Sequence, residues 1–217
     1  MPEPEDLFAR NRAWASGMLR REPDFFARLS SQQAPEFLWI GCADSRVPAN
    51  EIVGLMPGEL FVHRNVANVV PHADLNSASV IQFAVDILRV RHVIVCGHYG
   101  CGGVQAVLSN ARLGLVDLWL RHVREVAERH EALLASLDGD AERLARLCEL
   151  NVIEQVRHVA RSTILQDAWA RGQNVAVHGW IYGVGDGLLR DLATCVRSPD
   201  DIESCYRAAV GALGSSR

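Results

Sequence analysis

The sequence predicts an α/β fold in which a mostly parallel β-sheet is flanked by helices and preceded by an N-terminal helical arm. Three observations lead to this prediction. Four short apolar runs have the pattern of buried strands, amphipathic helical patterns separate or follow them, and the strand–helix–strand order favours parallel pairing through right-handed crossovers. The length of 217 residues, of which 49% are hydrophobic, suits one compact domain, so we assign residues 1–217 to a single domain.

The arm is the first element along the chain. Residues 5–30 have the pattern of two short amphipathic helices, and Pro23 is expected in the first turn of the second one. The arm as a whole extends over about residues 3–30. A terminal arm of this kind packs either on a partner subunit or on its own domain, and the sequence leaves both alternatives open.

The body of the domain follows the arm. Predicted strands lie at 37–42, 59–64, 90–96 and 174–180, and a helix with one apolar face is predicted from about 76 to 88. Residues 115–171 are predicted to be almost wholly helical, as two or three helices with a break near 138–140. A last helix is predicted over about 200–212.

Composition excludes several classes of protein. The formal net charge of −4 argues against a nucleic-acid partner, which requires a basic face. The sequence contains no apolar run that approaches the roughly 20 residues needed to span a bilayer, so we expect no membrane association. The acidic start lacks the features of a secretory signal, and we therefore expect a cytoplasmic protein. In a reducing compartment the six cysteines are thiols or metal ligands rather than a disulfide framework.

Metal-ligand side chains follow two of the predicted strands. Cys42 ends the first strand, and His98 and Cys101 come shortly after the third. Ligands in an open α/β sheet gather beyond the carboxyl ends of its strands. Two thiolates and one imidazole suit zinc, and three protein ligands leave its fourth position free for catalysis. The sequence therefore predicts one zinc ion per subunit at this edge.

The donor set has an electrostatic consequence. Zn²⁺ with two thiolates is neutral, whereas three imidazoles leave the ion with its full charge. The neutral centre polarises a water molecule less, so we expect a water pKa above the roughly 7 of an all-histidine zinc site. Activity at such a centre should favour alkaline pH.

A carboxylate lies close to the predicted ligands. Asp44 is two residues from Cys42 and could bind zinc as a conditional fourth ligand, which would close the site. Arg46, two residues further on, could hold the carboxylate off the metal. Asp44 would then be free to orient the zinc-bound hydroxide.

At this point the sequence resembles a known family. The segments Cys42–Pro48 (CADSRVP) and Gly97–Gly103 (GHYGCGG) are similar to the two signatures of the β-class carbonic anhydrases. The resemblance is collinear from about residue 5 to 192, and it is strongest to bacterial members with a non-catalytic bicarbonate pocket. It also includes the segments Gly58–Asn68, Cys148–Val152 and His178–Trp180. From about Thr194 onward, the sequence shows no reliable resemblance to this family.

The resemblance implies a function and a site. It implies reversible hydration of CO₂ to bicarbonate and a proton by attack of zinc-bound hydroxide, with Asp44 and Arg46 as a gating pair. Gln33 matches the family glutamine that reaches substrate across a dimer interface. Gly102 matches the position whose backbone N–H holds the substrate. The assembly implied is a homodimer or a homotetramer.

The resemblance also implies regulation. Trp39, Arg64 and Tyr182 match the residues of the bicarbonate pocket, with Tyr182 placed by a one-residue offset. In such members bicarbonate stabilises the form with the carboxylate of Asp44 on zinc. We therefore expect allosteric inhibition by bicarbonate at lower pH.

Three other functions are alternatives to CO₂ hydration. A nucleobase deaminase also uses one histidine and two cysteines, but His98 is not followed by the glutamate of an H-x-E motif. A carbon disulfide hydrolase-like relative shares the same motifs and stays open as an alternative. So does a non-catalytic zinc- or bicarbonate-binding protein, which would need Asp44 held permanently on the metal.

Overall fold

The computed structural model describes residues 3–31 and 33–215. The strands are β1 (Phe37–Cys42), β2 (Leu60–Asn65), β3 (His92–His98), β4 (Ala176–Tyr182) and β5 (Leu189–Val196). The α-helices are α1 (Pro4–Arg21), α2 (Phe25–Ser31), α3 (Ala49–Val53), α4 (Leu75–Gln82), α5 (Gly102–Leu108), α6 (Val116–Arg129), α7 (Glu131–Ala135), α8 (Asp140–Arg161), α9 (Thr163–Ala170) and α10 (Ile202–Ser215). Single turns lie at η1 (Val66–Asn68), η2 (Phe83–Ile87) and η3 (Pro199–Asp201).

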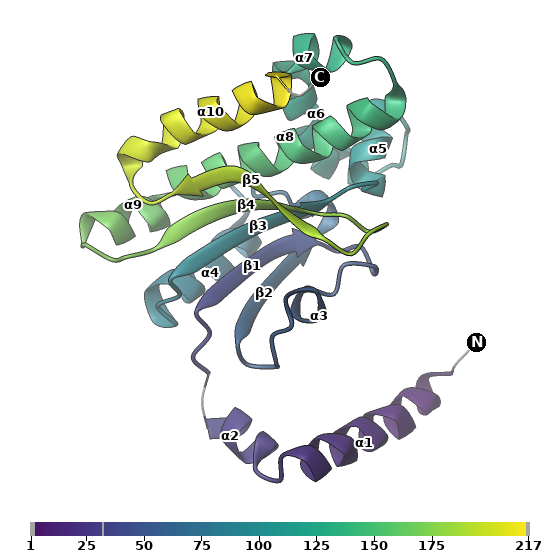
Figure 1. The fold of residues 1–217 in the computed structure, drawn as a ribbon, viewed down its shortest axis with the longest axis vertical. Helices are drawn as coiled ribbons and strands as arrows, with labels where there is room; N and C mark the ends of the chain where they lie inside the picture. The colour runs from purple at the N-terminus through teal and green to yellow at the C-terminus, as the bar shows by residue number, and fades with distance from the viewer. Residues whose placement is uncertain (1–2, 32, 216–217) are drawn as a thin grey trace.

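The strands form one sheet in the order β2-β1-β3-β4-β5, with β2, β1, β3 and β4 parallel. All four predicted strands are confirmed: β1 has the predicted bounds, β2 lies one residue later, and β3 and β4 each lie two residues later than predicted. The shift in β3 makes His98 the last residue of that strand. The α/β architecture predicted from the strand–helix–strand order is therefore confirmed (Figure 1).

The fifth strand was not predicted. β5 runs antiparallel to β4, and the register between them shifts at Gly179 and Trp180. A Cβ on Gly179 would lie 2.1 Å from Oγ1 of Thr194, so only glycine allows the two strands to approach this closely. This strand makes the sheet mostly rather than wholly parallel.

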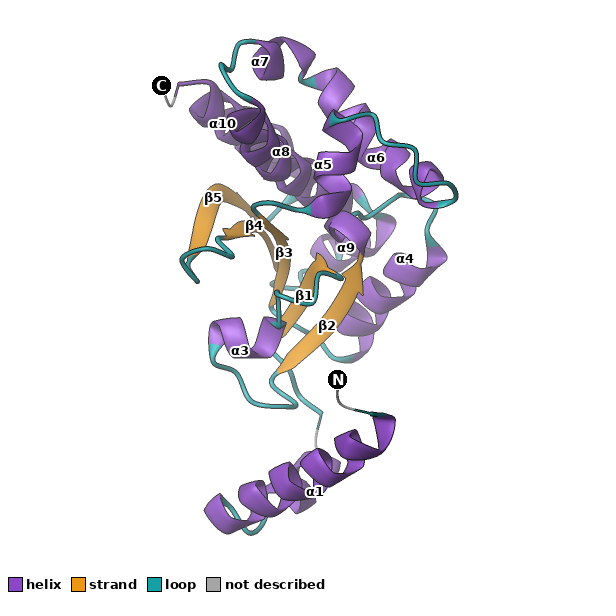
Figure 2. Ribbon diagram, turned by 90° about the vertical axis from the view of Figure 1, so that its right-hand side faces the viewer, coloured by secondary structure: helices purple, strands orange, loops and turns teal. Residues whose placement is uncertain are grey.

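The two faces of the sheet are covered unequally (Figure 2). Helices α4, α8 and α9 pack on one face, where Leu38, Ile40, Val93 and Val95 join the main core. The short helix α3 lies on the opposite face, against Trp39, Ile94 and Cys96. A further core around α5, α6 and α8 reaches Cys42 and Cys101 at the end of the sheet.

The helical segment from 115 to 171 is more divided than predicted. It contains the four helices α6 to α9, and the expected break near 138–140 separates α7 from α8. The helix predicted over 76–88 is present as α4, with η2 as its last turn. The last helix starts near its predicted position and continues to Ser215. None of the described helices combines the length and apolar character needed to cross a membrane.

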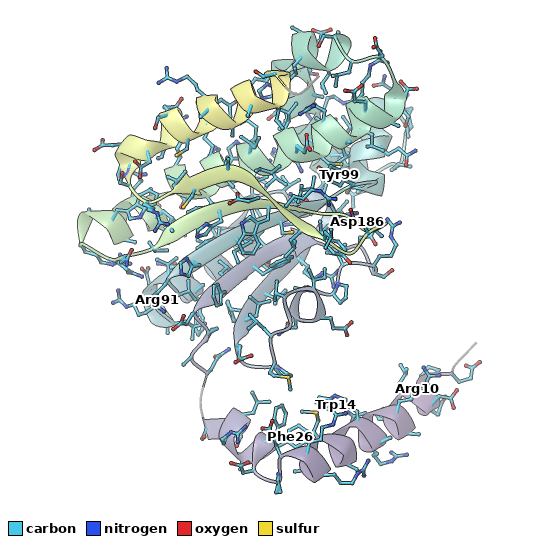
Figure 3. All side chains as sticks on the ribbon, in the orientation of Figure 1. Arg10, Trp14, Phe26, Arg91, Tyr99 and Asp186 are labelled. Atoms are coloured by element: carbon cyan, nitrogen blue, oxygen red, sulfur yellow. The ribbon has the colours of Figure 1, made fainter. Side chains whose placement is uncertain are left out.

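The N-terminal arm extends away from the body of the domain (Figure 1). Its two helices pack on each other through Trp14 and Phe26, whose rings meet edge to face at a centroid distance of 5.6 Å (Figure 3). Both predicted helices are present. The second begins at Phe25, so Pro23 lies in the turn before it rather than in its first turn.

Candidate metal centre

Three metal-ligand side chains converge at the carboxyl end of the sheet. β1 and β3 are adjacent and parallel, so Cys42 and His98 lie at the same edge, and the turn after β3 returns Cys101 to them. The ligand atoms of these three residues all lie within 4.8 Å of one another, and all three residues are buried. This is the only such group of three among the described residues.

The ring of His98 is oriented so that its Nε2 atom is free to bind a metal ion. Nδ1 lies 3.1 Å from the backbone oxygen of Tyr99, a geometry in which Nδ1–H donates to that oxygen. This fixes the lone pair on Nε2, as in metal-binding histidines whose other nitrogen is hydrogen-bonded. Nε2 is buried and has no hydrogen-bond partner among the described residues. A metal ion would satisfy it.

The spacing of the two sulfur atoms also fits zinc. Sγ of Cys42 lies 3.9 Å from Sγ of Cys101. Zinc–sulfur bonds of about 2.3 Å at the tetrahedral angle place two thiolates about 3.8 Å apart. The residues present therefore fit a zinc ion with two thiolates and one imidazole.

The two thiols behave as a coupled pair. The hydrogen bond with Cys101, the ring of His98 and the backbone N–H groups of Asp44 and Ala67 favour the thiolate form of Cys42, against the effect of burial. These contacts lower the pKa of Cys42 to about 4. The charge held on Cys42 and the burial of Cys101 raise the pKa of Cys101. A divalent cation between the sulfurs offsets that repulsion and favours loss of the second proton.

Asp44 lies beside this cluster and is held by Arg46. The guanidinium donates from Nε to Oδ1 at 2.9 Å and from Nη2 to Oδ2 at 2.6 Å, and the backbone N–H of Arg46 also donates to Oδ1. These bonds hold the pKa of Asp44 well below its usual range. Oδ2 still lies 3.7 Å from Nε2 of His98. The carboxylate is therefore next to the ligand cluster while both of its oxygens are bound to Arg46.

The three residues expected to bind bicarbonate share one face of the sheet. Trp39 is buried on β1, Arg64 pairs in register with Gly41 of the same strand, and Tyr182 pairs with His98. Nε of Arg64 donates to the backbone oxygen of Cys42 at 2.9 Å, and Nη2 donates to the backbone oxygen of Asp44. This contact between Arg64 and the ligand segment was not predicted from the sequence.

Gln33 is not brought to the metal-ligand cluster of its own chain. It is exposed and precedes the amino end of β1, whereas Cys42 is at the carboxyl end. A strand of six residues spans roughly 17–20 Å, so Gln33 is remote from this cluster. Gly102 begins α5 directly after Cys101, and a Cβ on it would meet no atom within 4 Å. Its N–H is one of the first-turn groups that have no acceptor within their own helix.

Sequence analysis missed the residues that support the cluster from α8. Asn151 and Gln155 are fully buried and bind the segment after β2. Two amides four residues apart, flanked by Leu150, Val152, Ile153 and Val156, are a signal in the sequence, since amides buried among apolar side chains need partners. Glu149 accepts a hydrogen bond from the hydroxyl of Tyr99 at 2.6 Å, next to His98.

Comparisons with known proteins agree with this centre. A family model described as carbonic anhydrase matches residues 37–189. A protein named carbonic anhydrase from Emericella nidulans is 48% identical over 206 residues, which cover 88% of this chain and 90% of the relative. A crystal structure of a β-carbonic anhydrase from Sordaria macrospora, described as tetrameric, has a TM-score of 0.84 and 39% identity, and the match covers 88% of this chain and 98% of that one.

A bacterial relative was also found. A carbonic anhydrase from Pseudomonas aeruginosa is 35% identical over 176 residues, which cover 77% of each chain. The identity to the Emericella protein is higher, so these comparisons do not single out the bicarbonate-regulated bacterial members expected from the sequence.

Proposed function

The chain belongs to the β-class carbonic anhydrases, and from this premise we propose that it hydrates CO₂ reversibly at one zinc ion held by Cys42, His98 and Cys101. The observation that carries the proposal is the buried group of two sulfurs and one unpartnered imidazole nitrogen beside a restrained carboxylate. Three protein donors leave one tetrahedral position for a reacting molecule. A carbon disulfide hydrolase and a non-catalytic binding protein are not favoured, because the relatives compared are named as carbonic anhydrases.

When bound, the zinc ion would supply Lewis acidity that makes a water molecule acidic enough to act as a nucleophile at mildly alkaline pH. The chain supplies orientation. Asp44 keeps Oδ2 beside the ligand cluster, where it accepts a hydrogen bond from the nucleophile and sets its direction. The N–H of Gly102, on the residue after Cys101, has no acceptor within its own helix and can hold a substrate oxygen.

We propose that Asp44 is a gate as well as an orienting group. While Arg46 holds both carboxylate oxygens, the fourth position is open to substrate. Release of Arg46 would free Asp44 to occupy that position itself. The short separation between Oδ2 and Nε2 of His98 supports this, because only a small movement is required.

The bicarbonate pocket of Trp39, Arg64 and Tyr182 is proposed as the regulator of this gate. Its support is the contact of Arg64 with the backbone oxygens of Cys42 and Asp44, which flank the gating segment. An anion that drew the guanidinium away would loosen the segment that carries Asp44. The anion can shift the gate only by its preference for the closed form.

Assembly into at least a dimer is proposed from the arm. Leu7, Phe8, Trp14 and Leu19 are all exposed large apolar side chains of α1. Gln33 follows the arm and is remote from the metal-ligand cluster of its own chain. This supports an arrangement in which Gln33 contributes to the site of a second copy of the chain. We further propose that two such dimers associate into a tetramer, the assembly described for the Sordaria enzyme. Cytoplasmic location stays a prediction, which cell fractionation tests.

Stopped-flow CO₂ hydration from pH 6 to 9, with zinc content measured in parallel, tests the function. We expect one zinc per subunit and activity that rises toward alkaline pH. Cys42→Ser serves as the matched variant, because serine keeps the shape and removes a thiolate. Zinc-loaded protein without hydration activity would contradict the proposed function, and flat activity across this range would contradict the expected weak polarisation of water.

A further inference from the structure

Two consecutive residues beside the metal centre have a left-handed backbone. Ala67 has φ 63° and Asn68 has φ 47°, and both are fully buried in η1, directly after β2. Residues other than glycine rarely adopt positive φ, and such strain persists only where the surroundings enforce it. We call residues 65–70 the left-handed turn segment. The contacts of this segment must therefore be what holds it in the left-handed conformation.

The segment contacts the residues around Cys42. The backbone oxygen of Asn65 accepts a hydrogen bond from the N–H of Ala43 at 2.8 Å, which extends the pairing of β1 and β2 past the ligand. Cys42 itself pairs in register with Asn65, the first residue of the segment. Cys42 and Ala67 also belong to the same buried cluster of side chains.

The segment also packs against the neighbours of the other two ligands. A Cβ on Gly97, which precedes His98, would lie 3.4 Å from Oδ1 of Asn68. A Cβ on Gly103, two residues after Cys101, would lie 3.4 Å from Cβ of Ala67. All three chain segments that carry ligands therefore approach the same left-handed turn.

Two amide side chains of α8 hold the turn. Nδ2 of Asn151 donates to the backbone oxygen of Ala67 at 2.9 Å, and Oε1 of Gln155 accepts from the N–H of Val70 at 2.8 Å. Nε2 of Gln155 donates to Oδ1 of Asn151 at 3.0 Å, so the amides form one connected pair. Both side chains are buried, where an unmade hydrogen bond is costly. The side chain of Asn65 adds local bonds, to the backbone of Val69 and to the ring of His63.

We propose that Asn151 and Gln155 are positioning residues for the metal centre, and that they act on Cys42 and on the approach of the other two ligands through the left-handed turn. The hydrogen bonds of these two side chains go to Ala67, Val70, His158 and each other, with none to Cys42, His98 or Cys101 in the described structure, so we assign them no catalytic role. The inference rests on the proposed zinc site. It extends that site to a second layer of hydrogen bonds, which in metalloproteins orients the ligands.

Two variants and one control separate positioning from general support of the fold. Asn151→Asp keeps the shape of the side chain and removes the donor to Ala67. Gln155→Met is close to isosteric and removes the acceptor for Val70. The control is Glu154→Gln on the same helix, because Glu154 is equally buried and polar but bonds to Arg129, His130 and Tyr206 instead.

Each protein is measured for thermal stability, for zinc affinity by chelator competition, and for the thiolate-to-cobalt absorption band after cobalt substitution. We expect Asn151→Asp and Gln155→Met to weaken zinc binding by roughly 10–100-fold and to shift the cobalt band. Glu154→Gln should lose stability while its zinc affinity stays within about twofold of wild type and its band is unchanged, because its contacts do not reach the turn.

Unchanged zinc affinity and an unchanged cobalt band in a folded Asn151→Asp or Gln155→Met protein would overturn the proposal. So would equal effects in Glu154→Gln, since loss of stability alone would then explain them. If neither amide variant folds while the control does, the amides are structural and the proposal is withdrawn. Failure of the wild-type chain to bind zinc at all would instead contradict the proposed function.

Discussion

The side chain of Arg46 binds both carboxylate oxygens of Asp44, from Nε at 2.9 Å and from Nη2 at 2.6 Å. The two residues are only two positions apart, and the backbone N–H of Arg46 reinforces the contact. Bidentate pairs of this kind are directional as well as strong. Arg46 therefore orients the carboxylate of Asp44 beside the metal-ligand cluster, while Arg64 holds its backbone oxygen.

Replacement of Arg46 by alanine should release Asp44. The freed carboxylate would compete for the fourth metal position, and we expect CO₂ hydration to fall by roughly 10–100-fold with zinc content unchanged. Stopped-flow rates and zinc analysis measure this. Arg46→Lys keeps the positive charge but cannot bind both carboxylate oxygens in the bidentate geometry of a guanidinium. Its loss of CO₂ hydration activity should therefore be smaller than that of Arg46→Ala. Full activity in Arg46→Ala would show that Asp44 needs no restraint.

Arg64 links the proposed bicarbonate pocket to the same segment. Arg64→Ala and Trp39→Ala should both reduce the inhibition of CO₂ hydration by added bicarbonate below pH 8. Arg64→Ala should also change the pH profile without bicarbonate, because it removes the donors to the backbone oxygens of Cys42 and Asp44. The measurement is the pH–activity curve with and without bicarbonate. If both variants keep the steepness and the bicarbonate sensitivity of wild type, the pocket has no regulatory role here.

The exposed apolar face of α1 should be needed for assembly. Phe8→Glu places a charge on this face, and we expect light scattering after size exclusion to show a smaller species than wild type. CO₂ hydration should fall with it, since Gln33 would no longer reach a second copy. Arg20→Glu is the control, because Arg20 is an exposed polar residue of the same helix on a different face from Phe8. A monomeric wild-type protein with full activity would contradict the assembly.

The parts of the fold that follow from local pattern were predicted, and the parts that depend on distant pairing were not. β1 is a continuous apolar run, and its sequence alone identifies it as buried. β5 has no regular alternation: its first five residues are exposed or half-exposed, and only Thr194 and Val196 near its end are buried. It is stabilised by pairing with β4 across a register shift, so its sequence carries little local signal. Likewise, motif spacing located Cys42 and His98, but the sequence does not show which backbone groups the amides of Asn151 and Gln155 bind.

The buried carboxylate of Glu154 should make the protein sensitive to acid. Burial opposes its ionisation, but hydrogen bonds from His130, Tyr206 and Arg129 outweigh this and lower the pKa of Glu154 to about 2. A carboxyl with a depressed pKa stabilises the folded state above its unfolded pKa, and this stability is lost as pH falls from about 5 toward 2. The full effect is about 3 kcal/mol.

Urea unfolding at pH 7, 5, 4 and 3 measures the contribution of Glu154. Glu154→Gln should be less stable than wild type at pH 7, and the difference should shrink as the medium becomes more acidic. Zinc loss in acid affects both proteins alike and cancels in the comparison. A difference that is constant over the whole range would show that the Glu154 carboxylate does not drive the acid sensitivity.

Protonation of His158 should destabilise the folded protein at higher pH than protonation of Glu154 does. It packs against His72 at a ring-centroid distance of 4.4 Å, and Nδ1 lies 3.2 Å from the backbone oxygen of Val70. Burial, with a smaller effect of His72, lowers the pKa of His158 to about 4. The unfolded chain binds a proton near pH 6.5 and the folded chain does not, so stability should fall as pH drops from 6.5 to 4. Allowing for partial exposure, the loss is about 2–3 kcal/mol.

His158→Gln removes the titrating ring and keeps a polar side chain that reaches toward Val70. The free energy of unfolding of this variant should therefore change less than that of wild type between pH 6.5 and 4. Below pH 4 the two proteins should respond in parallel, because the remaining acid sensitivity comes from Glu154, which the variant keeps. Equal slopes for the two proteins between pH 6.5 and 4 would mean that His158 is charged in the folded protein, contrary to its burial.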